Sequence, residues 1–362
     1  MTLPLVDLPG EPHLCGQAHG EHLRADIAAG IERWRADIAG SGVSPDILIA
    51  DFVASRDFAT ATRTWTPWLI DELDGIARAS GTDPVELWAY QLIDELWEFL
   101  RERLGKHRSE HCSTIGIDAG PGRTVIAQNL DLPASYDGLL HVLRIAPYDQ
   151  RPGVSVVTAA GVVGMAGMNA AGVSVGVNSL PDVTSARSGL PVAAVVRGAL
   201  AHTSAGLASE WLAHVPHASG QAYTIADADE LTNVECDAAA VAVVPVRDGV
   251  VVHTNHALRL PRKTADTSPA AVDSAARLDF LQRHCPDALS AVEDLLTVLD
   301  DTSVPIRRAD APGMPNRTCA TLMFDSADTA QAWVRGGLAE SNFVDATPPM
   351  LRPRATRMGT LA

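Results

Sequence analysis

A cysteine, Cys112, stands between a charged stretch, Arg101 to His111, and a run of β-forming residues. A thiol at the start of a strand, reached by an exposed and cleavable loop, could become the first residue of a chain. Its own α-amine, which titrates near about 7.7–8, could then accept the thiol proton without a histidine partner. These residues suggest a cysteine nucleophile that uses its own amine as the base. A lone cysteine is more often a small buried apolar residue, and that alternative stays open.

Further polar residues stand where apolar runs begin or end. Asp131 follows Asn129 by two positions, so both side chains share one face of the predicted strand. Asn178 ends another apolar run, and its amide would be a good donor to a developing oxyanion. Arg317 opens the last strand-like run and could hold a carboxylate through a bidentate pair. Turn or solvated-loop roles explain each position equally well.

Two histidines, His253 and His256, flank Asn255 in the motif HTNH. Two histidines at this spacing could suggest a metal site. On a strand, however, positions 253 and 256 point to opposite faces, and no acidic or cysteine ligand stands at zinc-like spacing. The sequence also lacks GxGxxG, P-loop and HExxH motifs. We therefore predict neither a metal nor a cofactor.

The elements that must position these residues change character at Cys112. Residues 17–110 have apolar side chains at helical spacing, with helices predicted over 17–38, 68–80 and 85–104. Residues 112–260 are rich in short β-branched runs broken by Gly, Asn and Pro. Helices are predicted again at 191–214 and 268–301, before a last strand. This order favours an α+β layered fold over alternating βαβ units.

Composition excludes several classes of protein. The chain has 362 residues, with 44 acidic and 28 basic side chains and a net charge of −16. No Lys/Arg-rich run offers a footprint for nucleic acid or an anionic membrane. The low-charge stretch 154–177 contains a Gly-Met-Asn-Ala-Ala-Gly turn, so we interpret it as two buried strands rather than a membrane span. The N-terminus lacks a signal-peptide pattern, and a cytoplasmic protein with free thiols is expected.

Several short motifs occur in a fixed order along almost the whole chain. Before Cys112 they are Gly16 to Gly20 and the run LDGIA, residues 73–77, followed by Gly81. From Cys112 onward they are HCST, QNLDLP, GMNAAGVSVGVNSLP, HTNH and NRTCATLMFD. In this order they resemble the peptidase C45 family of N-terminal nucleophile (Ntn) hydrolases. That group contains the penicillin-forming acyl-coenzyme A:6-aminopenicillanate acyltransferase and β-alanyl-amine hydrolases.

The resemblance implies both a fold and a domain organisation. The fold class is α+β, a four-layer αββα Ntn-hydrolase sandwich over residues 112–362, preceded by a helical pro-segment over residues 1–111. The nucleophile is Cys112, exposed by autoproteolysis of the His111–Cys112 bond. The pro-segment is expected to stay bound as a partner after cleavage, because its release would expose an apolar face.

The resemblance also implies roles for four further residues. The catalytic aspartate falls on Asp131, a second site asparagine on Asn255 and the family's arginine on Arg317. Asn178 falls on the oxyanion-hole asparagine of the wider Ntn group. Amides of Asn178 or Asn255 would stabilise the oxyanion, while Asp131 with Arg317 would orient the amine and the thiolate.

The leading hypothesis is an autoprocessed amide hydrolase or acyltransferase for a small N-acyl compound. One alternative keeps the fold and makes the protein an N-acyltransferase with a coenzyme A thioester as co-substrate. Another is an unprocessed, non-catalytic protein with the Ntn fold. The second alternative is motivated by His111, because the family usually carries Gly immediately before the nucleophile.

Overall fold

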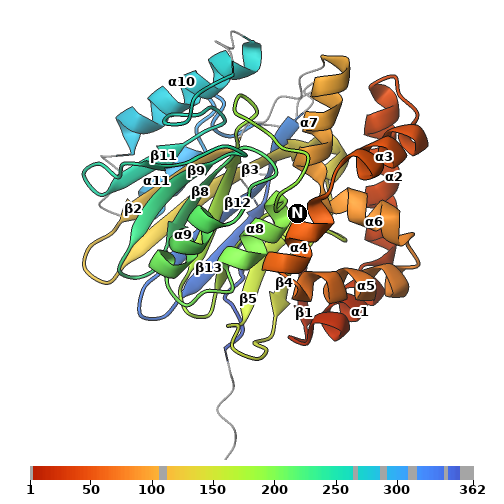
Figure 1. The fold of residues 1–362 in the computed structure, drawn as a ribbon. Coiled ribbons are helices and arrows are strands. Elements are labelled where there is room, and N and C mark those ends of the chain that lie inside the picture. The colour runs from red at the N-terminus through yellow and green to blue at the C-terminus, as the bar shows by residue number, and fades with distance from the viewer. Residues whose placement is uncertain are drawn as a thin grey trace, which may run out of the picture.

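The computed structural model describes residues 3–105, 112–263, 268–285, 292–308, 316–337 and 341–350. Two β-sheets form the centre of the fold (Figure 1). The first has the order β1-β4-β5-β6-β7-β8-β9-β10, and the second has the order β11-β2-β3-β12-β13-β14. Every pairing is antiparallel except that of β1 with β4, which is parallel.

The strands of the first sheet are β1 (Leu5–Leu8), β4 (Leu140–Ile145), β5 (Val154–Ala159), β6 (Ala166–Asn169), β7 (Ser174–Ser179), β8 (Gln221–Ala226), β9 (Leu231–Cys236) and β10 (Val241–Val244). Those of the second sheet are β2 (Ser113–Asp118), β3 (Thr124–Pro133), β11 (Val250–His253), β12 (Asn316–Ser326), β13 (Gln331–Gly336) and β14 (Val344–Asp345). A short 3₁₀ turn, Ala134–Tyr136, follows β3.

The helices fall into an N-terminal group and two outer layers. The N-terminal group is α1 (Pro12–His22), α2 (Arg24–Gly40), α3 (Pro45–Ser55), α4 (Phe58–Trp65), α5 (Trp68–Ser80), α6 (Pro84–Gln91) and α7 (Ile93–Leu104). The outer layers are α8 (Val192–Ala199) with α9 (Ala205–His214), and α10 (Pro269–His284) with α11 (Val292–Leu299). Figure 1 shows the N-terminal helices, in red and orange, gathered beside the sheets.

Alternate side chains of β3 define the layers. Ile126 belongs to the large apolar cluster, and Gln128 donates to the carbonyl of Val177 in the first sheet at 2.6 Å. Val125 and Ala127 instead belong to a second cluster with residues of α10 and α11. Since successive strand residues face opposite ways, the second sheet packs against the first on one side and against helices on the other.

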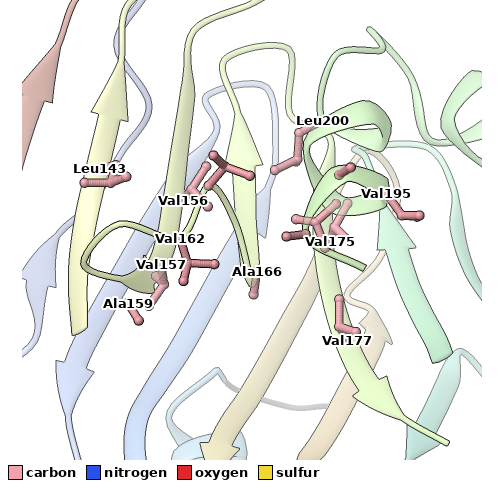
Figure 2. Packing of buried hydrophobic residues seen from close by; sticks show 14 of the residues in the cluster. Leu143, Val156, Val157, Ala159, Val162, Ala166, Val175, Val177, Val195 and Leu200 are labelled. Carbon is pink, nitrogen blue, oxygen red and sulfur yellow. The ribbon is translucent and has the colours of Figure 1, made fainter. Parts of the chain in front are cut away.

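The first sheet is covered on its outer side by α8 and α9. Figure 2 shows Val156, Val175 and Val195, from β5, β7 and α8, among the buried residues of the large cluster. Helix α9 packs against β8 and β9. The four layers are therefore helices, sheet, sheet and helices, which confirms the predicted αββα sandwich.

Local sequence explains where several helices begin and end. The Asp83 carboxylate accepts from the backbone N–H groups of Val85 and Glu86, and Pro84 occupies the first turn of α6. Helix α5 ends at Gly81, whose φ of 78° lies in the left-handed region that favours glycine.

The structure differs from the sequence prediction in several elements. The helices predicted over 17–38 and 191–214 are each divided in two, as α1 with α2 and as α8 with α9. The N-terminal segment is not wholly helical, because β1 joins the first sheet. The helix predicted over 85–104 breaks at Leu92, where the preceding Gln91 side chain binds the backbone of Gly161 and Val163. Residues 154–177 hold parts of three strands rather than two, because β6 adds a further short pairing between β5 and β7.

The length and hydropathy of the helices bear on membrane crossing. Within the ranges described above, no single helix is long and apolar enough to cross a membrane. Helices α2 and α3 reach that length and hydropathy only as a pair, and they are bent by 95° relative to each other.

Candidate active site

Cys112 lies immediately before β2, as the sequence predicts, and its side chain is buried with 8% of the residue exposed. The thiol points to the carbonyl of Asp131 on β3 at an S···O distance of 3.8 Å. The Cys112 carbonyl accepts from Asn178 Nδ2 at 3.1 Å and from Arg277 Nη1 at 2.7 Å. Side chains from the first sheet and from α10 therefore converge on one backbone group of Cys112.

Arg277 connects Cys112 to Asn255. Its Nη1 also donates to Ser113 Oγ at 2.9 Å, and its Nη2 donates to Asn255 Oδ1 at 3.1 Å. Its Nε pairs with the Asp273 carboxylate at 2.9 Å, and no part of its side chain is exposed. The guanidinium fork thus fixes the start of β2, an asparagine beyond β11 and one turn of α10 relative to one another.

Sequence reasoning missed Arg277, although a signal for it was present. Ser274, Leu278 and Leu281 stand at helical spacing with Arg277, so a period of 3.6 residues places this arginine on the buried stripe of α10. A charged residue on that stripe requires buried partners.

Asp131 is buried, and it accepts a hydrogen bond from Thr318 Oγ1 at 2.6 Å. Its Oδ2 lies 3.6 Å from Arg308 Nε, an ion-pair distance without a hydrogen bond. Burial raises the pKa of this carboxyl to about 7, although Thr318, Arg277 and Arg308 act in the opposite direction. Asn129 shares its face of β3, as predicted, and donates to the carbonyls of Leu299 and Ile306.

The two predicted asparagines both contact backbone at the site. Asn178 Nδ2 donates to Cys112 as described above. Asn255 Nδ2 donates to the carbonyl of Ser179 at 3.1 Å, and its backbone N–H donates to Ser274 Oγ at 2.8 Å. Because an amide nitrogen carries two N–H groups, the side chain of each asparagine has a second donor besides the one that binds backbone.

Arg317 does not take the predicted place beside Asp131. Its guanidinium pairs with the Asp137 carboxylate, and its register partner on β3 is Leu132. Thr318 occupies the position opposite Asp131, because adjacent strand residues face opposite ways. The arginines beside Asp131 are Arg277 and Arg308 instead. His111, the other residue of the predicted cleavage site, lies outside the described residues.

A cavity of about 100 Å³ lies beside Cys112. Its walls are mainly apolar and come from α6, α7, β3 and the 3₁₀ turn after it, β7, β8, α8, β12 and the loop after β5. The polar side chains in the wall, apart from Cys112 and the tyrosine and tryptophan rings, are Gln91, Asp94, Asp131, Ser179, Gln221 and Asn316. Helix α7 supplies Ile93, Asp94 and Trp97, so the N-terminal segment forms part of the cavity wall.

The HTNH histidines have protein partners. His253 Nε2 lies 2.9 Å from Glu235 Oε1, and His256 Nδ1 lies 2.8 Å from Ser274 Oγ. Among the described residues, no group of three or more His, Cys, Asp or Glu side chains is placed to hold a metal ion. These histidines support the loop that carries Asn255.

Residues 119–336 match the model of a protein family described as acyl-coenzyme A:6-aminopenicillanic acid acyl-transferase. The chain belongs to this family. The assignment confirms the predicted family, whose members are Ntn hydrolases and acyltransferases. The matched span contains Asp131, Asn178, Asn255 and Arg277 but begins after Cys112.

A curated relative is the 40 kDa form of acyl-coenzyme A:6-aminopenicillanic-acid-acyltransferase from Emericella nidulans. It is 25% identical over 300 residues, which cover 82% of this chain and 78% of the relative.

Three solved structures are similar in part. An N-acylethanolamine-hydrolyzing acid amidase orthologue from Caenorhabditis elegans has 16% identity and a TM-score of 0.44, covering 64% of this chain and 95% of that one. A conjugated bile acid hydrolase variant from Clostridium perfringens has 14% identity and a TM-score of 0.46. The match covers 65% of this chain and 92% of the hydrolase. Penicillin V acylase from Agrobacterium tumefaciens has 15% identity and a TM-score of 0.42, covering 65% and 86%.

Proposed function

We propose that the protein cleaves or transfers the acyl group of a small N-acyl compound through an acyl-enzyme on Cys112. The observation that carries the proposal is the placement of Cys112, which lies in the cavity wall while Asn178 and Arg277 hold its carbonyl. Family membership supports the same chemistry, because the family's members transfer or hydrolyse acyl groups.

The proposal includes autoproteolysis of the His111–Cys112 bond. Cleavage would give Cys112 a free α-amine beside its own thiol, and that amine titrates near about 8. The thiol proton would then pass to the amine, which leaves the thiolate as the nucleophile. The hydrogen bonds to the Cys112 carbonyl would keep the new chain end in register with β2, so the amine and the sulfur stay in place.

The reaction follows from these positions. Sγ attacks the substrate carbonyl, and the electron pair of the C=O bond moves to oxygen. Amide N–H groups of Asn178 or Asn255 donate to that oxyanion. The α-ammonium then returns its proton to the leaving amine as the C–N bond breaks, and the acyl group remains on sulfur. Water attacks the thioester in hydrolysis, whereas a second amine attacks it in transfer.

Asp131 acts beside the nucleophile in this scheme. Asp131 lies on β3, and its backbone carbonyl accepts a hydrogen bond from the Cys112 thiol. We assign Asp131 the role of orienting the new α-amine, with Arg277 and Arg308 balancing its charge. Arg317, which the sequence predicted for this role, pairs with Asp137 instead.

A coenzyme A-dependent N-acyltransferase is the second candidate. The family description and the relative from Emericella nidulans both name an acyl-coenzyme A transferase, which favours it. The two candidates share the acyl-enzyme and differ in what forms or resolves it. Acyl transfer from a coenzyme A thioester to an amine, with little release to water, would favour the second.

The test is the intact mass of the denatured protein beside that of Cys112→Ala. Fragments 1–111 and 112–362 in the wild type, with one unbroken chain in the variant, are expected. Cys319→Ala is the matched control, because Cys319 is also buried near the end of β3 and should leave cleavage unchanged. A single chain in every sample, with Cys112 inert to iodoacetamide, would overturn the proposal in favour of a non-catalytic protein.

A further inference from the structure

The loop that joins β5 to β6, residues 160–165, forms one side of the cavity. Three of its residues line the wall: Val162, Gly164 and Met165. The loop turns at Gly161, whose φ of 85° lies in the left-handed region that favours glycine. A Cβ atom at this position would lie 3.2 Å from Ile27 on α2, so the loop packs closely against the N-terminal segment. The shape of the cavity therefore depends on where this loop is held.

Side chains from outside the loop bind both backbone polar groups of Gly161 and both of Val163. Gln91 Nε2 donates to the Gly161 carbonyl at 2.8 Å, and Gln91 Oε1 accepts from the Val163 N–H at 3.0 Å. His19 Nε2 accepts from the Gly161 N–H at 2.9 Å. Arg197 Nη1 donates to the Val163 carbonyl at 3.0 Å. Because buried backbone groups need partners, these contacts from α1, α6 and α8 fix the position of the loop.

Gln91 makes two of these four contacts, and it is 3% exposed. Its amide also donates to the carbonyl of Leu87 at 3.1 Å, so both of its N–H groups are used by backbone. His19 is fully buried, and burial lowers its pKa to about 3. The ring is therefore neutral near pH 7, which keeps Nε2 available as an acceptor. Both residues precede Cys112 in the chain, whereas the loop follows it.

We propose that Gln91 is a positioning residue that determines which acyl groups the cavity accepts, because it holds the β5–β6 loop in place. This inference rests on the proposed function, in which the acyl group stays bonded to Cys112 beside this wall. The cavity of about 100 Å³ is smaller than a protein cavity of about 150 Å³ that binds benzene. The fixed loop therefore excludes long acyl chains. Residues 1–111 would thus determine substrate choice, although the nucleophile lies in residues 112–362.

The experiment compares kcat/KM for butanoyl-p-nitroanilide and octanoyl-p-nitroanilide. The wild type should prefer the butanoyl compound, because the wall leaves no room for four further methylene groups. Gln91→Met keeps an unbranched side chain but removes the donors and the acceptor, so the backbone groups of Gly161 and Val163 lose partners and the loop shifts. The octanoyl-to-butanoyl ratio of kcat/KM should rise at least about tenfold relative to the wild type.

His19→Leu is the second variant, and it tests the loop independently of direct contact. His19 does not line the cavity, so a change in the ratio can come only through the loop. The ratio should rise in this variant as well. It also tests the proposal if Gln91→Met does not fold.

Asn169→Leu is the matched control. Asn169 is fully buried at the end of β6, and its amide binds backbone groups on both sides of its own turn and at the end of α8. Its side chain lies outside the cavity wall. This variant should lower the midpoint of thermal unfolding but keep the wild-type ratio, which separates the selectivity of the cavity from overall stability.

The outcomes distinguish this inference from the proposed function. An unchanged ratio in folded Gln91→Met and His19→Leu would overturn the inference while acyl transfer at Cys112 stands. A change in Gln91→Met alone would also overturn it, because Gln91 would then act by touching the acyl chain. If no compound releases p-nitroaniline or adds an acyl mass to Cys112 in the wild type, the proposed function fails and the inference fails with it.

Discussion

Near Cys112, two arginines and two aspartates form a set with balanced formal charge, in which Arg277, Arg308 and Asp131 are buried and Asp273 is partly exposed. Arg277 pairs with Asp273 at 2.9 Å, and Arg308 pairs with Asp273 at 2.6 Å and approaches Asp131 at 3.6 Å. Burying an unpaired charge costs several kcal/mol, so these four groups depend on one another. Arg277 is the member that also binds the nucleophile's own carbonyl, and its loss should affect both chemistry and folding.

Replacing Arg277 with Lys should lower kcat/KM for any turned-over substrate by about 100-fold, because one ammonium cannot reach Cys112, Ser113 and Asn255 together. Most of the loss should fall on kcat if Arg277 positions the nucleophile. Steady-state kinetics would measure the split between kcat and KM. Arg283→Lys, on the same helix with its side chain 61% exposed, is the control. A normal kcat in Arg277→Lys would show that the arginine is only structural.

Asn178→Ala should lower kcat by about 10²–10³ with little change in KM, because an oxyanion donor acts mainly in the transition state. Asn233 on β9 is the matched control, since its amide binds Thr224 and lies outside the cavity wall. Thermal unfolding of both variants would separate a catalytic loss from a folding defect. Unchanged turnover in a folded Asn178→Ala would remove this residue from the site.

At the scale of elements, the sequence predicted those features that depend on residues close together in the chain. The helix over 68–80 appears with those bounds, and Asn129 and Asp131 share a face because strand periodicity is local. Contacts between distant segments determined two features that these local patterns did not predict. The break at Leu92 accompanies bonds from Gln91 to a loop some 70 residues away. The neighbours of Asp131 depend on the pairing of β3 with β12, which no short sequence window contains.

Helix α7 is attached to α8 through Glu95. Its Oε1 accepts from the Val192 N–H at 3.0 Å and from Ser219 Oγ at 2.8 Å, so it caps an N-terminus that has no side-chain cap of its own. Burial raises the pKa of Glu95 from 4.5 to about 7. The protonated form is therefore favoured by folding. Its contribution to stability is full below pH 4.5 and is lost as the pH rises through about 7.

Glu95→Gln should remove this pH dependence. A shift of this size corresponds to about 3 kcal/mol, which the wild type should lose relative to the variant between about pH 4.5 and 8. Urea unfolding at a series of pH values would measure the difference. Glu102→Gln on the same helix, where the side chain is 48% exposed, should retain the wild-type profile. Parallel stability curves for wild type and Glu95→Gln would contradict this assignment.

At the scale of the whole molecule, the N-terminal segment and the rest of the chain share one core. Strand β1 pairs with β4 from Leu5↔Val142 to Leu8↔Ile145. Glu72 on α5 and Arg197 on α8 form a buried bidentate pair with N···O distances of 2.7 and 2.8 Å. The large apolar cluster contains residues from both parts. A cut between the parts would therefore leave most of the contacts that hold them intact.

After cleavage at the His111–Cys112 bond, the two fragments should therefore remain a single folded unit. Fragments 1–111 and 112–362 should elute together in size-exclusion chromatography and unfold in one thermal transition. Glu72→Ala should lower that transition, because leaving Arg197 buried without its partner costs about 3–5 kcal/mol. Glu86→Ala is the control, since Glu86 pairs with Arg35 at a more exposed site. Separation of the fragments without denaturant would contradict the shared core. It would also remove Asp94 and Trp97 from the cavity wall, so substrate preference should change with fragment loss.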